Sequence, residues 1–249
     1  MSLTFFLPLA GLARSLVPIV SRLSNLNRVP ILCYVTDRWT LSRANGPDRR
    51  EALLHKIEEA AAAGVDWVQI REKDLSGKEC AALTSAAIER AARPSTRRRG
   101  TTRILVNDRL DVALSQAAGG VHLGENSMPV EEVRKLGDSR TRSQDFLIGV
   151  SCHSVEAARA AARGGANYIF FGPVFATPSK AAFGAPQGLA RLAEVCRAVS
   201  LPVVAIGGIA LEYAALCLSA GASGIAAIRL FQDAQDLVSL VKTLRTQKV

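Results

Sequence analysis

Short apolar runs recur along the chain, and each is followed by a segment with helical spacing. The runs are rich in Val, Ile and Phe, as in strands that are buried on both faces. In the segments between them, apolar residues recur every three or four positions, as in helices that cover a sheet. The pattern predicts eight strands, at residues 31–36, 65–70, 104–106, 120–123, 146–150, 168–171, 202–206 and 224–228.

Helices are expected after each strand, with Ser76 and Ser154 as N-caps and Gly64 as a C-terminal stop. Eight strand–helix units with short connections predict an α/β fold, a closed (β/α)8 TIM barrel, with an open doubly wound sheet as the alternative. The helices are predicted at residues 49–63, 78–92, 112–117, from Pro129 onward, and at 155–163, 189–199, 212–220 and 233–245.

The chain length of 249 residues suits one large domain. We expect residues 29–249 to form the barrel and residues 1–28 to form an N-terminal extension. The extension contains an apolar run at residues 5–10, but no Lys or Arg precedes it, unlike the start of a signal peptide. No apolar run reaches transmembrane length, so we expect no membrane association.

The formal net charge of +9 favours anionic ligands. Much of the excess is local, at residues 93–99 and 134–142, and lacks the aromatic partners that are typical of nucleic-acid surfaces. We therefore expect small phosphorylated substrates and no nucleic acid, and leave a homo-oligomer open. The five cysteines are scattered and odd in number, which indicates reduced thiols in a cytoplasmic protein.

Polar residues follow nearly every predicted strand. Because the carboxyl ends of barrel strands open on one face, these residues should converge there. Their cations, hydroxyls and backbone amides together suit the binding of phosphate oxygens. The converging set is Arg71, Lys73, Asn107, Asp108, Ser151, His153, Thr177, Ser179, Lys180, Gly207 and Gly208.

Arg71 and Lys73 alternate along an extended segment, so they should face the same way. Two cations on one side predict a phosphate or pyrophosphate group between them. The alternative is a pair of surface salt bridges with Glu72 and Asp74.

Asp108, beside Asn107, offers oxygen ligands to a hard cation such as Mg2+, or it caps a helix. His122 lies inside a strand pattern and is expected to be packed. His153 lies just past a strand end, where either direct chemistry or a structural role is open to it.

Several ordered motifs resemble the thiamine phosphate synthases and their close relatives, the thiazole tautomerases. The resemblance covers the chain from Ile31 onward. The motifs lie at residues 34–37, 69–74, 106–113, 120–124, 149–154, 172–175 and 205–209.

The resemblance implies a synthase that joins hydroxymethylpyrimidine pyrophosphate to a thiazole phosphate and releases pyrophosphate. Gln69 would then contact the pyrimidine, and Asp108 would hold Mg2+. Ser151, His153 and Lys180 are the candidate catalytic residues. The resemblance assigns the pyrophosphate to Arg71, Lys73, Asn107 and Lys180, with Ser151 touching the same region, and the thiazole phosphate to Thr177, Ser179 and Gly208. Gly207 is a candidate beside Gly208 because barrels commonly bind phosphate after the seventh strand.

Three positions depart from the synthase pattern. Ser127 occupies the place of a metal-binding Asp, residues 181–183 are apolar, and residues 229–231 replace a Ser-Gly or Ser-Ala pair. The tautomerases also lack the second carboxylate, and their proton transfer depends on a His at position 153. The alternatives to a synthase are thus a thiazole tautomerase or a non-catalytic barrel that binds a thiamine precursor.

Overall fold

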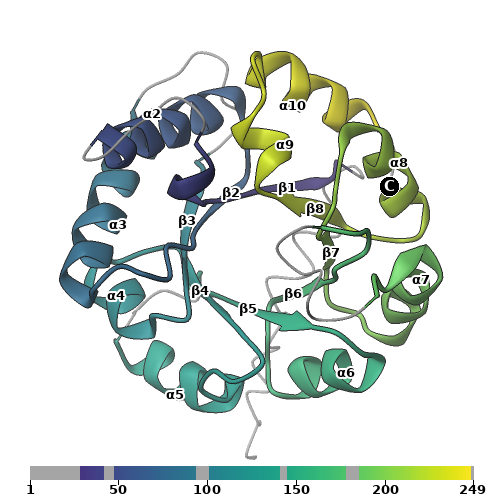
Figure 1. The fold of residues 1–249 in the computed structure, drawn as a ribbon. Helices are drawn as coiled ribbons and strands as arrows, with labels where there is room; N and C mark the ends of the chain where they lie inside the picture. Colours follow the sequence, from purple (N-terminus) through teal and green to yellow (C-terminus); the bar gives the residue numbers. More distant parts are fainter. Residues whose placement is uncertain (1–28, 42–47, 94–100, 141–144, 178–184, 248–249) are drawn as a thin grey trace, which may run out of the picture.

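Eight parallel strands close into a barrel in the computed structural model, which describes residues 29–41, 48–93, 101–140, 145–177 and 185–247. The prediction of a (β/α)8 barrel is confirmed, and the open-sheet alternative is wrong. Figure 1 shows the ring of strands inside a ring of helices. The strands are β1 Ile31–Val35, β2 Trp67–Ile70, β3 Arg103–Asn107, β4 Gly120–Leu123, β5 Leu147–Cys152, β6 Tyr168–Phe171, β7 Val203–Ile206 and β8 Gly224–Ala227.

Helices cover the outside of this barrel. The cluster between strands and helices is aliphatic and includes Leu53, Ile57 and Ile169, none of which is exposed to solvent. The helical elements are the 3-10 turn η1 Arg38–Thr40 and α2 Asp48–Ala63, α3 Gly77–Ala92, α4 Leu110–Ser115, α5 Val130–Arg140, α6 Val155–Arg163, α7 Gly188–Ala198, α8 Leu211–Ser219, α9 Arg229–Gln232 and α10 Leu237–Thr246.

The predicted helix ends are confirmed at three places. The Ser76 hydroxyl accepts from the N–H of Glu79, whose carboxylate in turn accepts from the N–H of Ser76, which forms a capping box. The Ser154 hydroxyl accepts from the N–H of Ala157 at 3.1 Å. Gly64 has a φ of +93° after α2, a conformation that favours glycine.

The closing helix predicted at residues 233–245 is present as α10, but it begins four residues later, at Leu237. The short α9 and a break precede it. Asp236 causes the second start, because its side chain accepts from the N–H of Ser239 at 3.0 Å. The second strand begins at Trp67 rather than Val65, because the N–H of Val65 still bonds to the carbonyl of Ala60 in α2.

The helix predicted at residues 112–117 is α4, which covers residues 110–115. Ala117 has a positive φ of 50°, outside helical conformation, so it ends this segment. Residues 1–28 and their predicted place outside the barrel lie beyond the described residues. In the described ranges, no helix combines the length and apolar character needed to cross a membrane.

The first and last strands of the barrel lie side by side. β1 pairs with β8, with Ile31 opposite Gly224. Arg245 of α10 donates to the carbonyls of Pro30 and Gly64 and to the carboxylate of Asp66. The last helix therefore holds both the start of β1 and the loop before β2.

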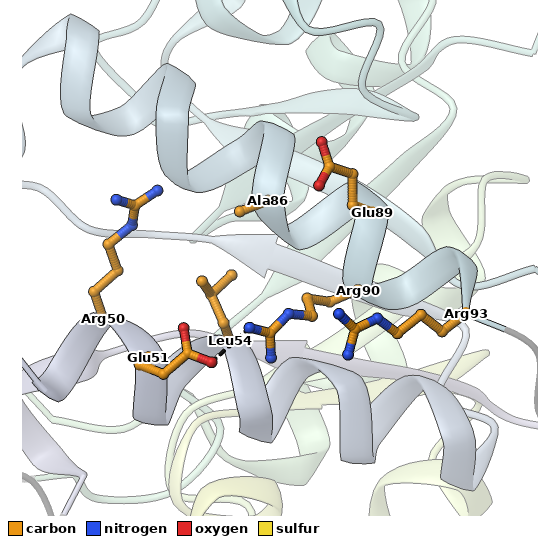
Figure 2. Close-up of a pocket in the computed structure, with 7 residues that line it drawn as sticks. All are labelled: Arg50, Glu51, Leu54, Ala86, Glu89, Arg90 and Arg93. Carbon is orange, nitrogen blue, oxygen red and sulfur yellow. Dashed lines mark hydrogen bonds and ion pairs between the residues drawn. The ribbon is translucent and has the colours of Figure 1, made fainter.

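A hollow of about 440 Å³ lies between α2 and α3 on the outer wall (Figure 2). Arg90 of α3 lies 2.5 Å from a carboxylate oxygen of Glu51 and 3.3 Å from one of Glu58, both on α2. Arg93 adds a second contact to Glu58 at 2.9 Å. The ion pairs that join α2 and α3 thus line this hollow, which lies away from the strand ends.

All five cysteine thiols are free. Cys33, Cys80, Cys152 and Cys217 are buried, and Cys196 is half-buried. Burial raises the pKa of Cys152 and of Cys217 to about 12, so neither thiol ionises readily. Four of the five cysteines are thus core residues.

Candidate active site at the barrel mouth

The polar residues predicted from strand ends lie at one mouth of the barrel. Gln69, Asn107 and Ser151 belong to β2, β3 and β5, and Asp108 follows β3 directly. In the sheet register, Gln69 of β2 pairs with Leu105 of β3, and Ser151 of β5 pairs with Phe170 of β6. His153, Thr177, Gly207 and Gly208 lie in loops after β5, β6 and β7, whereas Ser179 and Lys180 lie outside the described residues.

A chain of amides leads from the barrel interior to a carboxylate at the mouth. Gln69 is 2% exposed, and its Nε2 donates to Oδ1 of Asn107 at 2.7 Å. Nδ2 of Asn107 donates to Oδ2 of Asp108, also at 2.7 Å. Oε1 of Gln69 is buried and has no hydrogen-bond partner among the residues that the structure describes. Because buried polar atoms are normally satisfied, this oxygen is available to a donor on a bound molecule.

Asp108 has left-handed backbone conformation, with a φ of 58°. Such a φ is uncommon outside glycine and is enriched at functional sites. Oδ1 of Asp108 accepts from the N–H of Gly124 at 2.8 Å and from the hydroxyl of Ser127. The helix-cap alternative is wrong, because Arg109 occupies the N-cap position of α4 and no side chain caps that helix.

A magnesium ion fits this mouth only if a ligand supplies much of its coordination. In the described ranges, no three His, Cys, Asp or Glu side chains are grouped so that they could hold a metal ion. The position that carries a metal-binding Asp in the synthases is here Ser127, which contributes a neutral hydroxyl bonded to Asp108. Mg2+ often takes one or two carboxylates and completes its shell with waters and phosphate oxygens.

Arg71 is a cation without an ion-pair partner among the residues that the structure describes. Its backbone N–H donates to the hydroxyl of Thr36 at 2.9 Å, which fixes the start of the loop after β2. The proposed surface pairs of Arg71 with its acidic neighbours are wrong, because Glu72 and Asp74 are both held by Arg38, at 2.9 and 2.5 Å. Arg71 is half-buried and directly follows β2. Lys73 is exposed in the same loop.

His122 lies beneath the mouth and is packed, as expected from its strand. It is 1% exposed, and burial lowers its pKa to about 3, so the ring is neutral. Nδ1 lies 3.1 Å from the hydroxyl of Tyr168, and Nε2 lies 2.9 Å from Oγ of Ser151. Ser151 is half-buried, so its hydroxyl connects the interior to the mouth.

His153 faces the loop after β6. Its Nδ1 is hydrogen-bonded to the carbonyl oxygen of Gly172. A carbonyl only accepts, so Nδ1 carries a proton and donates it. The contact ties the end of β5 to the end of β6, which is a structural role, and leaves the chemistry of Nε2 open.

Gly207 and Gly208 have φ angles of +93° and +66°. A Cβ on Gly207 would lie 2.6 Å from Cα of Pro173, and one on Gly208 would lie 2.6 Å from the carbonyl oxygen of Ala176. The N–H of Phe175 donates to the carbonyl of Gly207 at 3.0 Å. Both glycines are therefore required for the close approach of the loops after β6 and β7. Thr177, which is half-buried, follows Ala176 in the first of these loops.

Sequence reasoning missed the residues that support this site. Thr36 is fully buried at the end of β1, donates to Glu72 at 2.7 Å and accepts from Arg71. Arg38 clamps the loop after β2 through Glu72 and Asp74. The available signal was positional, because both residues follow a strand in the same way as the predicted set does.

The closed barrel and its mouth define a (β/α)8-barrel protein whose strand ends present cations, hydroxyls and glycine backbone suited to phosphate oxygens. The family model described as thiamine monophosphate synthase matches residues 35–231. The chain belongs to this family.

Curated relatives carry the same family name. The chain is 46% identical over 198 residues to a "putative thiamine-phosphate synthase" of Geobacter sulfurreducens, covering 79% of this chain and 84% of that protein. It is 45% identical over 186 residues to a thiamine-phosphate synthase of Methanoculleus marisnigri, with coverage of 75% and 83%. Among solved structures, a thiamine phosphate pyrophosphorylase from Pyrococcus furiosus matches with a TM-score of 0.69 and 30% identity, over 88% of this chain and 95% of that one.

Proposed function

We propose that this protein is a thiamine-phosphate synthase, a transferase that joins hydroxymethylpyrimidine pyrophosphate to thiazole phosphate. Family membership and the names of the relatives support this function. The observation that carries it is the hydrogen-bonded chain of Gln69, Asn107 and Asp108, with Arg71 directly after β2. An amide with an orphaned oxygen suits a heterocycle that carries N–H donors, and the neighbouring cation suits its pyrophosphate.

In this reaction the bond between the pyrimidine methylene carbon and the pyrophosphate oxygen breaks, and both electrons leave with pyrophosphate. The lone pair of the thiazole ring nitrogen then attacks the resulting carbocation and forms the new C–N bond. The task of the protein is to stabilise the charge of the leaving group and to exclude water. In this proposal Arg71, Asn107 and Ser151 hold the pyrophosphate, with Lys73 and Lys180 as further cations.

The second phosphate belongs, in this proposal, to the mouth between β6 and β7. Gly207 and Gly208 leave the backbone there open to close approach, and Thr177 supplies a hydroxyl. Ser179 completes the set that the sequence predicts. The two substrates would thus occupy adjacent sectors of the same mouth, which brings the reacting atoms together.

We propose that Mg2+ is the cofactor and is shared between Asp108 and the pyrophosphate. Because Ser127 is neutral, the free protein binds the ion weakly, and binding tightens when pyrophosphate supplies oxygens. Ser127→Asp should tighten Mg2+ in titration calorimetry by about tenfold, as expected for one added charged ligand. Ser127→Asn is the matched neutral control. Equal Mg2+ affinity in the Asp and Asn variants would contradict a metal at Asp108.

A thiazole tautomerase is the second candidate, and it has specific support. Ser127 removes the second carboxylate, and His153 lies at the mouth with Nδ1 protonated toward Gly172. Nε2 of His153 is then the basic nitrogen that a proton transfer requires. A non-catalytic barrel that binds a thiamine precursor is the remaining alternative.

One experiment separates these functions. Purified protein is given both synthase substrates with and without Mg2+, and thiamine phosphate is detected by mass. In a second arm, the carboxythiazole phosphate tautomer is followed for proton exchange, with His153→Ala as the control. Thiamine phosphate formed only with Mg2+ supports the synthase. Proton exchange without thiamine phosphate would instead favour the tautomerase. If neither thiamine phosphate nor proton exchange is detected, the non-catalytic binding protein is the remaining function.

We also propose a cytoplasmic location, supported by five free thiols, and no role in nucleic-acid binding. The assembly state is a separate prediction. Light scattering of the purified chain would establish whether it forms a homo-oligomer.

A further inference from the structure

A line of three hydrogen-bonding groups runs from the barrel interior to the mouth. The hydroxyl of Tyr168 lies 3.1 Å from Nδ1 of His122, and Nε2 of His122 lies 2.9 Å from Oγ of Ser151. Tyr168 and His122 are each 1% exposed, whereas Ser151 is half-buried. The direction in which the protons lie along this line determines what Ser151 offers to a bound molecule.

The buried phenol sets that direction. Burial raises the pKa of Tyr168 well above its ordinary value, so the phenol keeps its proton. In the described ranges, Nδ1 of His122 is the one hydrogen-bond partner of this hydroxyl. If Nδ1 carried a proton, the phenolic O–H would be a buried donor without an acceptor, which native structures avoid. Nδ1 is therefore the acceptor, and the proton of the imidazole is on Nε2.

We propose that His122 and Tyr168 are positioning residues that fix Ser151 as a hydrogen-bond donor to an anionic oxygen of the substrate. The Nε2–H group donates to Oγ of Ser151, so the proton of Ser151 points to another acceptor. The same arrangement excludes His122 as a base that activates Ser151, because Nε2 already holds a proton. With the proposed function, the acceptor is a pyrophosphate oxygen.

The packing around His122 holds the ring in this orientation. Its centroid lies 4.2 Å from that of Phe170 and 5.6 Å from that of Tyr168. Gly149 stands between His122 and Tyr168 in the sheet register. A Cβ on Gly149 would lie 2.3 Å from the hydroxyl oxygen of Tyr168, so glycine is what lets the phenol reach across to β4.

The direct test is nitrogen NMR of the wild-type protein labelled with 15N-histidine. We expect the buried His122 to show a pyridine-like Nδ1 and a pyrrole-like Nε2, with the proton coupled to Nε2 alone. His122→Gln identifies the signal. A proton on Nδ1 would overturn the proposal, and this measurement does not depend on any variant folding.

Calorimetry with inorganic pyrophosphate and Mg2+ gives a second test. Tyr168→Phe removes the donor that holds the tautomer, so Nε2 can compete for the proton of Ser151, and we expect about a five- to tenfold loss of affinity, the value of one ordinary hydrogen bond. The matched control is Tyr34→Phe, which also deletes a buried hydroxyl, one that donates to Gln232 at 3.0 Å, but in a separate contact. Its affinity should stay within twofold.

An equal loss of affinity in the two tyrosine variants would mean general loosening and would overturn the positioning role. Absence of pyrophosphate binding to the wild type would also overturn it. Synthase turnover is measured separately. Lack of turnover together with the expected tautomer and pyrophosphate results would reject the proposed function and keep the inference about Ser151.

Discussion

Removing the charge of Arg38 should destabilise the protein far more than removing an arginine from the outer wall. The guanidinium contacts Glu72, whose side chain is 1% exposed, and Arg38 itself is 13% exposed. Loss of one partner of a buried pair generally costs about 3–5 kcal/mol, because the other charge is left in a low-dielectric site. Glu72 keeps the hydroxyl of Thr36 and the backbone N–H of Arg38, which lowers our expectation for Arg38→Met to about 2–3 kcal/mol.

The matched control is Arg90→Met. Arg90 also contacts two carboxylates, but Glu51 and Glu58 are 64% and 31% exposed, so solvent screens these pairs and the loss should be much smaller. For a chain of this size, each kcal/mol moves the melting temperature by about 2–4 °C. Thermal melts should therefore fall by about 4–12 °C in the Arg38→Met variant and by clearly less in the Arg90→Met variant.

A second substitution tests the physical reason. In the Arg38→Met background, Glu72→Gln removes the stranded charge and should restore at least half of the lost stability. Equal melting temperatures for Arg38→Met and Arg90→Met would contradict this reasoning. So would a failure of Glu72→Gln to restore stability, because either result would mean that the pair of Arg38 and Glu72 does not contribute the stability of a buried ion pair.

Two further predictions concern stability. Gly149→Ala should cost about 1–3 kcal/mol by overpacking, because its Cβ would lie 2.0 Å from Cζ of Tyr168, and urea unfolding with an unchanged midpoint would contradict this. Hydrogen bonds from Arg38 lower the pKa of Asp74 to about 2 from 3.8, so the folded state binds fewer protons than the unfolded chain. This contribution is present above about pH 4 and is lost as the pH falls toward 2, and an acid titration of Arg38→Met should show a smaller loss over that interval than wild type.

The repeating strands were predictable because each one is buried on both faces and reads as an unbroken apolar run, as at 168–171. The mouth followed from the rule that all strand ends open together. Side-chain partners could not be predicted. Arg38 rather than Arg71 binds Glu72, and this choice depends on a contact between two loops that are far apart in sequence. Asp236 was missed as a cap because the spacing of apolar residues continues across the break.

The direction of protons in the interior also lay beyond the sequence. His122 was expected to be packed, but its partners come from two other strands, and only their three-dimensional register shows that Gly149 leaves room for Tyr168. Similarly, the sequence left Asp108 open as a helix cap or a metal ligand, and only the structure shows that Arg109 occupies the N-cap position and that Oδ1 of Asp108 contacts Gly124 and Ser127.

The closure of the ring by its first and last strands has a consequence for the timing of biosynthesis. β1 leaves the ribosome early, yet its second neighbour is β8, and the bonds from Arg245 that secure this seam come from the last helix. Throughout translation, β1 therefore keeps one edge whose N–H and C=O groups lack their native partner. The ring can close only when almost the whole chain has emerged, so until that moment the nascent barrel must be shielded from pairing with other chains.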